Sequence, residues 1–184
     1  YFADENLEYQ RLEKQFKDKK QWIKDVPKLK TIAQIFRERG GFEILEKVQG
    51  RDMIGWEYEG PFDELEAQSL PGGYPFIDEK LKLDKKTSIS CHRVIDGGKD
   101  SIGNDVVVAG EGTGIVHVAP GCGSIDKQIA KKNDLVAIAP LDDESCYIDG
   151  FGDFVGKCAT DKNTTKMVIA SLKEKGYLLY EEKY

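Results

Sequence analysis

GEGTGIVHVAPGCGSID, residues 110–126, is the segment on which the expected fold depends most. Five of its seventeen residues are glycine, and these glycines bound a short apolar run on both sides. A run of β-branched residues between glycines is typical of a strand, and glycine also lets a ligand come close to the backbone. We therefore expect a strand in this segment and a ligand-binding site beside it.

Two side chains of this segment can carry chemistry. His117 lies within the expected strand, where a polar side chain must find a partner or face a cleft. Asp126 lies in the first turn of a helix that we expect to begin at Ser124, where the helix dipole favours a carboxylate. Taken alone, the two residues fit a core histidine and a helix-capping aspartate more readily than a functional pair.

Spacing argues against other catalytic and metal-binding patterns. GEGTG precedes a strand and lacks the lysine of a phosphate-binding loop, and the chain has no G-x-S-x-G sequence for a serine hydrolase. Cys122 near His117 matches no cysteine-nucleophile signature. A metal site made from these two and Asp126 would need a distant fourth ligand such as Cys91 or His92. We therefore expect no metal and no cofactor.

Composition narrows the class of protein. The 184 residues include 27 Lys and Arg against 33 Asp and Glu, which gives a net charge of −6. This balance argues against a protein that wraps a long stretch of nucleic acid, since phosphate binding needs concentrated positive charge. No apolar run reaches the about 20 residues that span a bilayer. We expect a cytoplasmic, monomeric protein that contacts no membrane and whose widely spaced cysteines are buried thiols. The chain opens on Tyr1 and reads as part of a longer protein.

The pattern of apolar and turn residues predicts a single domain over residues 1–184, with a helical part at 1–41 and a strand-rich core at 42–184. Apolar residues at helical spacing predict four helices, short apolar runs between turn residues predict strands, and residues 66–80 read as a surface loop. The helices are expected within 6–20, 28–39, 124–133 and 160–176, and the strands within 42–50, 87–95, 106–110, 113–120, 135–141 and 177–184. This is the pattern of an α+β domain.

Residues 112–126, GTGIVHVAPGCGSID, resemble the editing (connective polypeptide 1) domain of isoleucyl-tRNA synthetases, which belong to the class Ia aminoacyl-tRNA synthetase family. The resemblance extends to HRVI at 92–95, to FEILEKVQGRDMIGWEYEGPFD at 42–63 and to IAPLDDESCYIDGFGDFVGKCATD at 138–161. It covers about residues 42–184. The forms APGCG and HRVI look more like the isoleucine enzymes than the valine enzymes.

The resemblance implies an α+β fold, a β-barrel-like synthetase editing domain with peripheral helices, which hydrolyses valine esterified to tRNA(Ile). It is long established for such ligases that one methylene contributes only about 1–3 kcal/mol in a hydrophobic pocket, too little to separate isoleucine from valine in one step. A second site that hydrolyses the smaller product with a positioned water supplies the missing discrimination. The implied partners are the acceptor end of tRNA(Ile) carrying a mischarged amino acid and the rest of the parent synthetase.

The resemblance also assigns roles to residues. Asp126 matches the family's aspartate that binds the α-ammonium group of the substrate, and His117 matches the histidine that lines the pocket and helps to exclude isoleucine. These two are the expected catalytic residues. The expected substrate-binding residues shape the pocket and hold the terminal adenosine through their backbones, and they are Gly112, Thr113, Gly114, Ala119, Pro120, Gly121 and Gly123.

The chain departs from the family pattern in ways that bear on its activity. It lacks the threonine-rich strand that contributes to the family's pocket, and it lacks the H-I-G-H and K-M-S-K-S sequences of the aminoacylation site. We therefore do not expect this chain to aminoacylate tRNA. Three alternatives stay open: a non-catalytic fragment that binds the tRNA acceptor end, a valine-type editing domain, and an unrelated α+β domain.

Overall fold

The computed structural model describes residues 1–8, 30–108 and 113–181, and most of the first expected helix falls outside these ranges. The chain divides into two compact units, which we describe separately. Unit 1 comprises Tyr1–Gln49, Gly97–His117 and Tyr180–Tyr184, and unit 2 comprises Gly50–Asp96 and Val118–Leu179.

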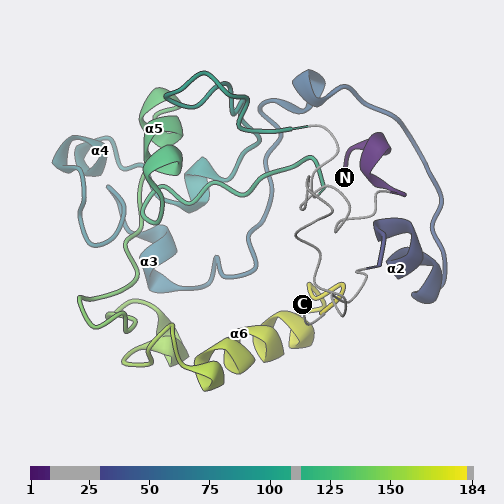
Figure 1. Cartoon of the computed structure of the whole chain (residues 1–184). Coiled ribbons are helices and arrows are strands. Elements are labelled where there is room, and N and C mark those ends of the chain that lie inside the picture. The colour runs from purple at the N-terminus through teal and green to yellow at the C-terminus, as the bar shows by residue number, and fades with distance from the viewer. Residues whose placement is uncertain (9–29, 109–112, 182–184) are drawn as a thin grey trace, which may run out of the picture. The chain divides into compact units, whose positions relative to one another are not determined.

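Helices make up the regular structure of the described residues (Figure 1). The α-helices are α2 (Ile32–Glu38), α3 (Glu66–Ser69), α4 (Glu79–Leu83), α5 (Ser124–Lys132) and α6 (Lys162–Glu174). Short 3-10 helices are η1 (Asp4–Asn6), η3 (Gly50–Met53), η4 (Ile89–Cys91) and η5 (Gly152–Phe154). Three of the α-helices lie where apolar spacing predicts them, whereas α3 and α4 overlap the ends of the expected loop. None of the helices in the described ranges is both long enough and apolar enough to cross a membrane.

Local hydrogen bonds explain where the predicted helices begin and end. Asp161 caps α6 by accepting a hydrogen bond from the backbone N–H of Asn163 at 2.8 Å, and the helix stops before Gly176, which has a φ of +77°. α2 opens with a capping box, in which the side chains of Thr31 and Gln34 each accept from the other's backbone N–H. These side chains satisfy donors that have no partner within the helix.

The α+β fold expected from the sequence, and the β-barrel-like form of it implied by the resemblance, are wrong for this structure. Extended segments in the described part of the chain meet only in isolated bridges, and no strand ladder forms among them. One such pairing joins Gly55–Tyr58 to His92–Val94, through backbone hydrogen bonds on both sides of the bridge between Glu57 and Arg93. The described chain is therefore an arrangement of helices and irregular segments.

The strands fail to form because an alternating apolar pattern predicts an extended chain but specifies no partner for its backbone. Ile44 and Leu45, in the first expected strand, are 54% and 87% exposed. Ile115 and Val116, in the glycine-bounded segment, are 46% and 48% exposed. A barrel needs paired strands that close on themselves and bury one face each. The exposed side chains show that these segments bury no such face.

The apolar core of unit 2 lies around Phe151 and Phe154, which are buried together with Ala67. Phe62 packs edge-on against Phe154 with ring centroids 5.9 Å apart, and Tyr74 packs in the same way against Phe151, also at 5.9 Å. Edge-to-face pairs of this kind add to the stabilisation that burial alone provides. The backbone N–H of Tyr74 also donates to the carbonyl of Ala137 at 3.1 Å, so this core is joined to the extended segment that contains Ala137.

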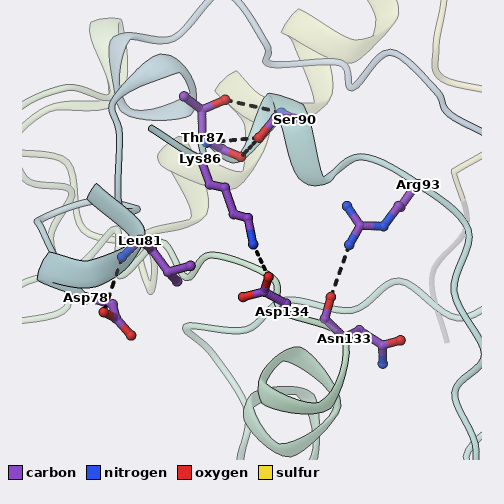
Figure 2. A network of polar contacts seen from close by, with 8 residues as sticks. All are labelled: Asp78, Leu81, Lys86, Thr87, Ser90, Arg93, Asn133 and Asp134. Carbon is purple, nitrogen blue, oxygen red and sulfur yellow. Dashed lines mark hydrogen bonds and ion pairs between the residues drawn. The ribbon is translucent and has the colours of Figure 1, made fainter. Parts of the chain in front are cut away.

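A network of polar contacts anchors the C-terminal end of α5 (Figure 2). Lys86 forms an ion pair with Asp134, and Arg93 donates a hydrogen bond to the backbone carbonyl of Asn133 at 3.0 Å. Asn133 is the C-cap residue of α5, so its carbonyl is one of those that the helix leaves without an internal partner. The segment that carries Lys86 and Arg93 therefore helps to hold α5.

The sequence led us to expect four buried thiols, and the structure differs from this expectation. Cys146 and Cys158 form a disulfide, and they face each other across an antiparallel bridge. Cys91 and Cys122 are free, and Cys122 is exposed. The spacing of the cysteines in the sequence did not reveal the disulfide, because the antiparallel pairing of the two segments brings Cys146 and Cys158 together.

Candidate functional site

A hollow of about 280 Å³ opens beside the start of α5 in unit 2. Three segments of the chain line it: Ile77, the loop and first helical turn between Pro120 and Lys127, and the extended stretch at Ala137 and Ala139. Backbone and small side chains thus form most of its wall. This is the place where the sequence predicts part of the substrate-binding site.

The carboxylate of Asp126 holds the loop that precedes α5. Its Oδ2 accepts a hydrogen bond from the backbone N–H of Ala119 at 3.1 Å. Within the loop, the N–H of Cys122 donates to the carbonyl of Ala119 at 2.9 Å. Among the described residues, none donates a hydrogen bond to Oδ1 of Asp126. One oxygen of this carboxylate therefore has a structural bond within the loop.

Glycine at position 121 lets the loop lie directly on the backbone of a neighbouring segment. A Cβ on Gly121 would stand 1.7 Å from the carbonyl oxygen of Ile138, a distance that no side chain can adopt. Gly73 makes a similar approach, since its Cβ would stand 2.1 Å from the carbonyl oxygen of Ala137. Next to it, the N–H of Tyr74 donates to that same carbonyl at 3.1 Å. Backbone therefore packs on backbone where these segments meet residues 137–139, of which Ala137 and Ala139 line the hollow.

Three of the expected site residues, Thr113, Gly114 and His117, belong to unit 1. The carbonyl of Thr113 accepts a hydrogen bond from the N–H of Ala3 at 2.6 Å, and a Cβ on Gly114 would stand 2.6 Å from the Cβ of Ala3. His117 is exposed, so it is not the core histidine that the plainer interpretation requires. Gly112 lies outside the described residues.

The other expected site residues gather in unit 2, at the loop and first turn of α5, and they are Ala119, Pro120, Gly121, Gly123 and Asp126. The structure thus brings Asp126 together with the glycine loop. The pairing of His117 with Asp126 at one site stays a prediction, because the two residues belong to units that are described separately.

Sequence reasoning missed several residues that line the hollow, among them Lys127 and Ile77. Lys127 directly follows Asp126 on α5, and its place beside the glycine loop was a signal that could have identified it. Ile77 comes from a Pro- and Gly-rich stretch far away in the sequence, and no local pattern connects it with the loop. Phe76, its neighbour, is 48% exposed and has the ammonium of Lys82 over its ring, 4.1 Å from the centroid.

A second hollow of unit 2, of about 530 Å³, has an acidic lining that includes Glu57, Glu59 and Asp63. Nδ1 of His92 lies 3.2 Å from Oδ1 of Asp63, and the ring of Tyr58 stacks on the imidazole with centroids 5.2 Å apart. Partial burial, and secondly the charge of Asp63, raise the pKa of Tyr58 above its ordinary value. Within the described ranges no group of three or more His, Cys, Asp or Glu side chains is arranged to hold a metal ion.

Comparison with known proteins relates the chain to a family of ligases. An isoleucine–tRNA ligase of Aquifex pyrophilus is 37% identical over 142 residues, which are 75% of this chain and 22% of the ligase. That of Methanocaldococcus jannaschii is 33% identical over 185 residues, covering 97% of this chain and 15% of the ligase. That of Tetrahymena thermophila is 28% identical over 152 residues, covering 80% of this chain and 12% of the ligase. No family model and no solved structure matches the chain.

These matches cover most of this chain but only a small part of each relative. The chain spans about a fifth or less of the length of the curated ligases that it matches. The similarity extends over ligases from distant organisms and includes the segment GTGIVHVAPGCGSID within the match that covers 97% of the chain. The chain therefore belongs to the isoleucine–tRNA ligase family, in which it corresponds to a segment of the much longer enzymes.

Proposed function

We propose that the chain is the proofreading segment of an isoleucine–tRNA ligase and that it hydrolyses the ester of valine mischarged onto tRNA(Ile). The observation that carries the proposal is the Asp126 carboxylate, bonded to the glycine loop beside a hollow at the start of α5. This loop and this carboxylate are the part of the motif that most resembles the editing domain of the family. Its substrate would be an ester with a free α-ammonium group.

Asp126 supplies the contact with that ammonium group. Its Oδ2 is already bonded to the N–H of Ala119, so the loop holds the carboxylate in one orientation. Oδ1 then accepts from the ammonium group in a charge-assisted hydrogen bond, which contributes about 1.5–3 kcal/mol. Binding the amino group in this way holds the ester next to the loop, where a water molecule can be oriented against it.

Hydrolysis of the ester requires one water molecule and no covalent intermediate. The water oxygen attacks the carbonyl carbon, the bond between that carbon and the ribose oxygen breaks, and the departing ribose oxygen takes a proton from the attacking water. The products are valine and uncharged tRNA. We assign to His117 the discrimination by size, since the resemblance places its imidazole against the amino-acid side chain.

The proposal implies the partners of the chain. It would act on the acceptor end of tRNA(Ile) in the cytoplasm, as part of the longer ligase. A net charge of −6 suits a module that contacts only the end of the tRNA, because the tRNA body would then be held by other parts of the enzyme.

A second candidate function is binding of the acceptor end without hydrolysis. The chain's lack of the threonine-rich strand that contributes to the family's pocket favours it, because a hydrolytic pocket would then be incomplete in this chain. The experiment below separates the two functions.

Deacylation of valyl-tRNA(Ile) by the full protein tests the proposal. Asp126→Ala is expected to lower the rate by about tenfold or more, since it removes a charge-assisted contact with the substrate. Asp143→Ala, which changes an exposed carboxylate that does not line the hollow, is the matched control and should leave the rate unchanged. His117→Ala should increase the hydrolysis of correctly charged isoleucyl-tRNA relative to valyl-tRNA.

The outcomes distinguish the candidate functions. If Asp126→Ala deacylates valyl-tRNA(Ile) at the full rate, Asp126 does not take part in the reaction. If His117→Ala leaves the ratio of the two hydrolysis rates unchanged, His117 does not select the substrate. An unmodified protein that binds tRNA(Ile) but hydrolyses neither ester would support the second candidate instead.

A further inference from the structure

A disulfide that the proposed function does not use bounds the segment that carries the core aromatic residues of unit 2. Cys146 and Cys158 lie 12 positions apart in the sequence and are joined covalently. Between them the chain places Phe151 and Phe154 in the apolar core, where both are buried. The disulfide therefore closes a loop around buried side chains, and it limits how far the two ends of this loop can separate.

Backbone hydrogen bonds join the two arms of the loop on either side of the disulfide. The N–H of Ala159 donates to the carbonyl of Ser145 at 2.9 Å. The N–H of Tyr147 donates to the carbonyl of Lys157 at 3.0 Å. All four residues are only partly buried, and hydrogen bonds in such places open transiently in native proteins. The disulfide therefore restrains an arrangement that would open more readily without it.

The first arm of the loop also contacts the segment that lines the hollow at the start of α5. Ile148, two residues after Cys146, donates its N–H to the carbonyl of Pro140 at 3.0 Å. Pro140 directly follows Ala139, and Ala139 lines the hollow. A change in the position of this arm therefore acts through the backbone on the wall of the hollow.

We propose that the disulfide between Cys146 and Cys158 is a redox-sensitive site that a dithiol reductant opens, and that its redox state sets how firmly the loop and the wall of the hollow are held. Both cysteines are partly exposed, so a reductant can reach the bond. Disulfides in a reducing cytoplasm are mostly transient or redox-sensing. The inference takes only this compartment from the proposed function, and it does not depend on the reaction that the hollow serves.

The exchange takes place in two steps. A thiolate of the dithiol attacks one sulfur of the disulfide, the S–S bond breaks, and the other cysteine leaves as a thiolate. The second thiol of the reductant loses its proton and attacks the mixed disulfide, which releases the remaining cysteine as a thiolate. Two electrons thus pass to the protein, the reductant leaves as a disulfide, and the two protons that it loses convert the cysteine thiolates to thiols.

Hydrogen exchange of the full chain, measured by peptide mass spectrometry with and without dithiothreitol, tests the inference under native conditions. Reduction should speed exchange in the peptides that cover 137–148 and 154–159 by about tenfold or more. Reoxidation should restore the slow exchange. The variant with both Cys146→Ser and Cys158→Ser should exchange at the faster rate whether or not the dithiol is present.

Cys91→Ser is the matched control, since Cys91 is a free and partly buried cysteine. It should respond to the dithiol as the unchanged chain does. Should the double variant fail to fold, the oxidised and reduced forms of the unchanged chain still give the comparison. Equal exchange in those two forms would overturn the inference, as would a disulfide that dithiothreitol reduces only after the chain has been unfolded in urea.

The two proposals can fail independently. Exchange that depends on the redox state, without deacylation of valyl-tRNA(Ile), would uphold this inference and overturn the hydrolytic function. Deacylation by a chain whose hydrogen exchange is the same in both redox states would uphold the hydrolytic function and overturn this inference.

Discussion

Oδ2 of Asp126 accepts a hydrogen bond from the backbone N–H of Ala119 at 3.1 Å. The contact joins the first turn of α5 to the residue that opens the glycine loop, so the helix and the loop form one structural element. A carboxylate in this place has two separable properties, an acceptor oxygen for the loop and a negative charge for a ligand. Substitutions that keep one property and remove the other distinguish the two.

The first prediction concerns stability. Asp126→Ala removes the acceptor for the N–H of Ala119 and should lower the free energy of unfolding by about 1 kcal/mol. Asp126→Asn should lower it by less, because an amide oxygen can still accept that bond, and yet it should still impair binding of an ammonium group. Urea unfolding of both variants measures the difference. An Asp126→Ala variant as stable as Asp143→Ala would show that the contact does not hold the loop.

The second prediction concerns the close approach of Gly121 to Ile138. In Gly121→Ala the new Cβ would stand 1.7 Å from the carbonyl oxygen and 2.6 Å from the carbonyl carbon, so the loop must move away. We expect a loss of about 1–3 kcal/mol or more in the free energy of unfolding, as in other overpacked sites. Gly50→Ala is the control, since no atom lies within 4 Å of its added Cβ. Equal urea midpoints for the two variants would contradict the backbone contact.

The third prediction concerns the ionisation of Tyr58 at alkaline pH. Partial burial first, and the charge of Asp63 second, raise the pKa of its hydroxyl above the ordinary 10.0. A folded-state pKa above the unfolded one favours the neutral phenol, so this contribution to stability is present below pH 10 and is lost as the pH rises through the higher folded-state value. The ultraviolet difference titration between the unchanged chain and Tyr58→Phe isolates this group.

Asp63→Asn provides the control for the cause of that shift. Removing the charge should lower the pKa of Tyr58 part of the way toward its ordinary value, while the larger effect of burial remains. A Tyr58 that titrates at its ordinary value in the folded chain would contradict the packing of this ring.

The fourth prediction concerns the cysteines. Iodoacetamide without reductant should label the exposed Cys122 rapidly and the half-buried Cys91 more slowly, and it should leave Cys146 and Cys158 unlabelled because they form a disulfide. Reduction of the unfolded chain should make all four available. Peptide mass spectrometry identifies the labelled positions, and alkylation of Cys146 or Cys158 before reduction would contradict the disulfide.

The helices α2, α5 and α6 were predictable from the sequence, whereas α3, α4 and the absence of strand ladders from the described residues were not. α5 and α6 lie where apolar spacing and the stop at Gly176 predict them, because a helix forms its hydrogen bonds between residues one turn apart. The segments 42–50 and 113–120 have the pattern of strands, yet their apolar side chains are largely exposed. A strand needs a partner from elsewhere in the chain, and the local pattern contains no information about which segment that is.

The candidate site was likewise only partly predictable. A short motif was enough to relate the chain to the isoleucine–tRNA ligases and to select Asp126 and the glycine loop, because these residues are neighbours in sequence. Three contacts became known only from the folded structure. Ile77 lines the same hollow as Lys127, Gly121 packs against the backbone of Ile138, and Cys146 forms a disulfide with Cys158. Such contacts join residues that are distant in sequence, and they depend on the packing of a whole unit rather than on hydrogen bonds between near neighbours.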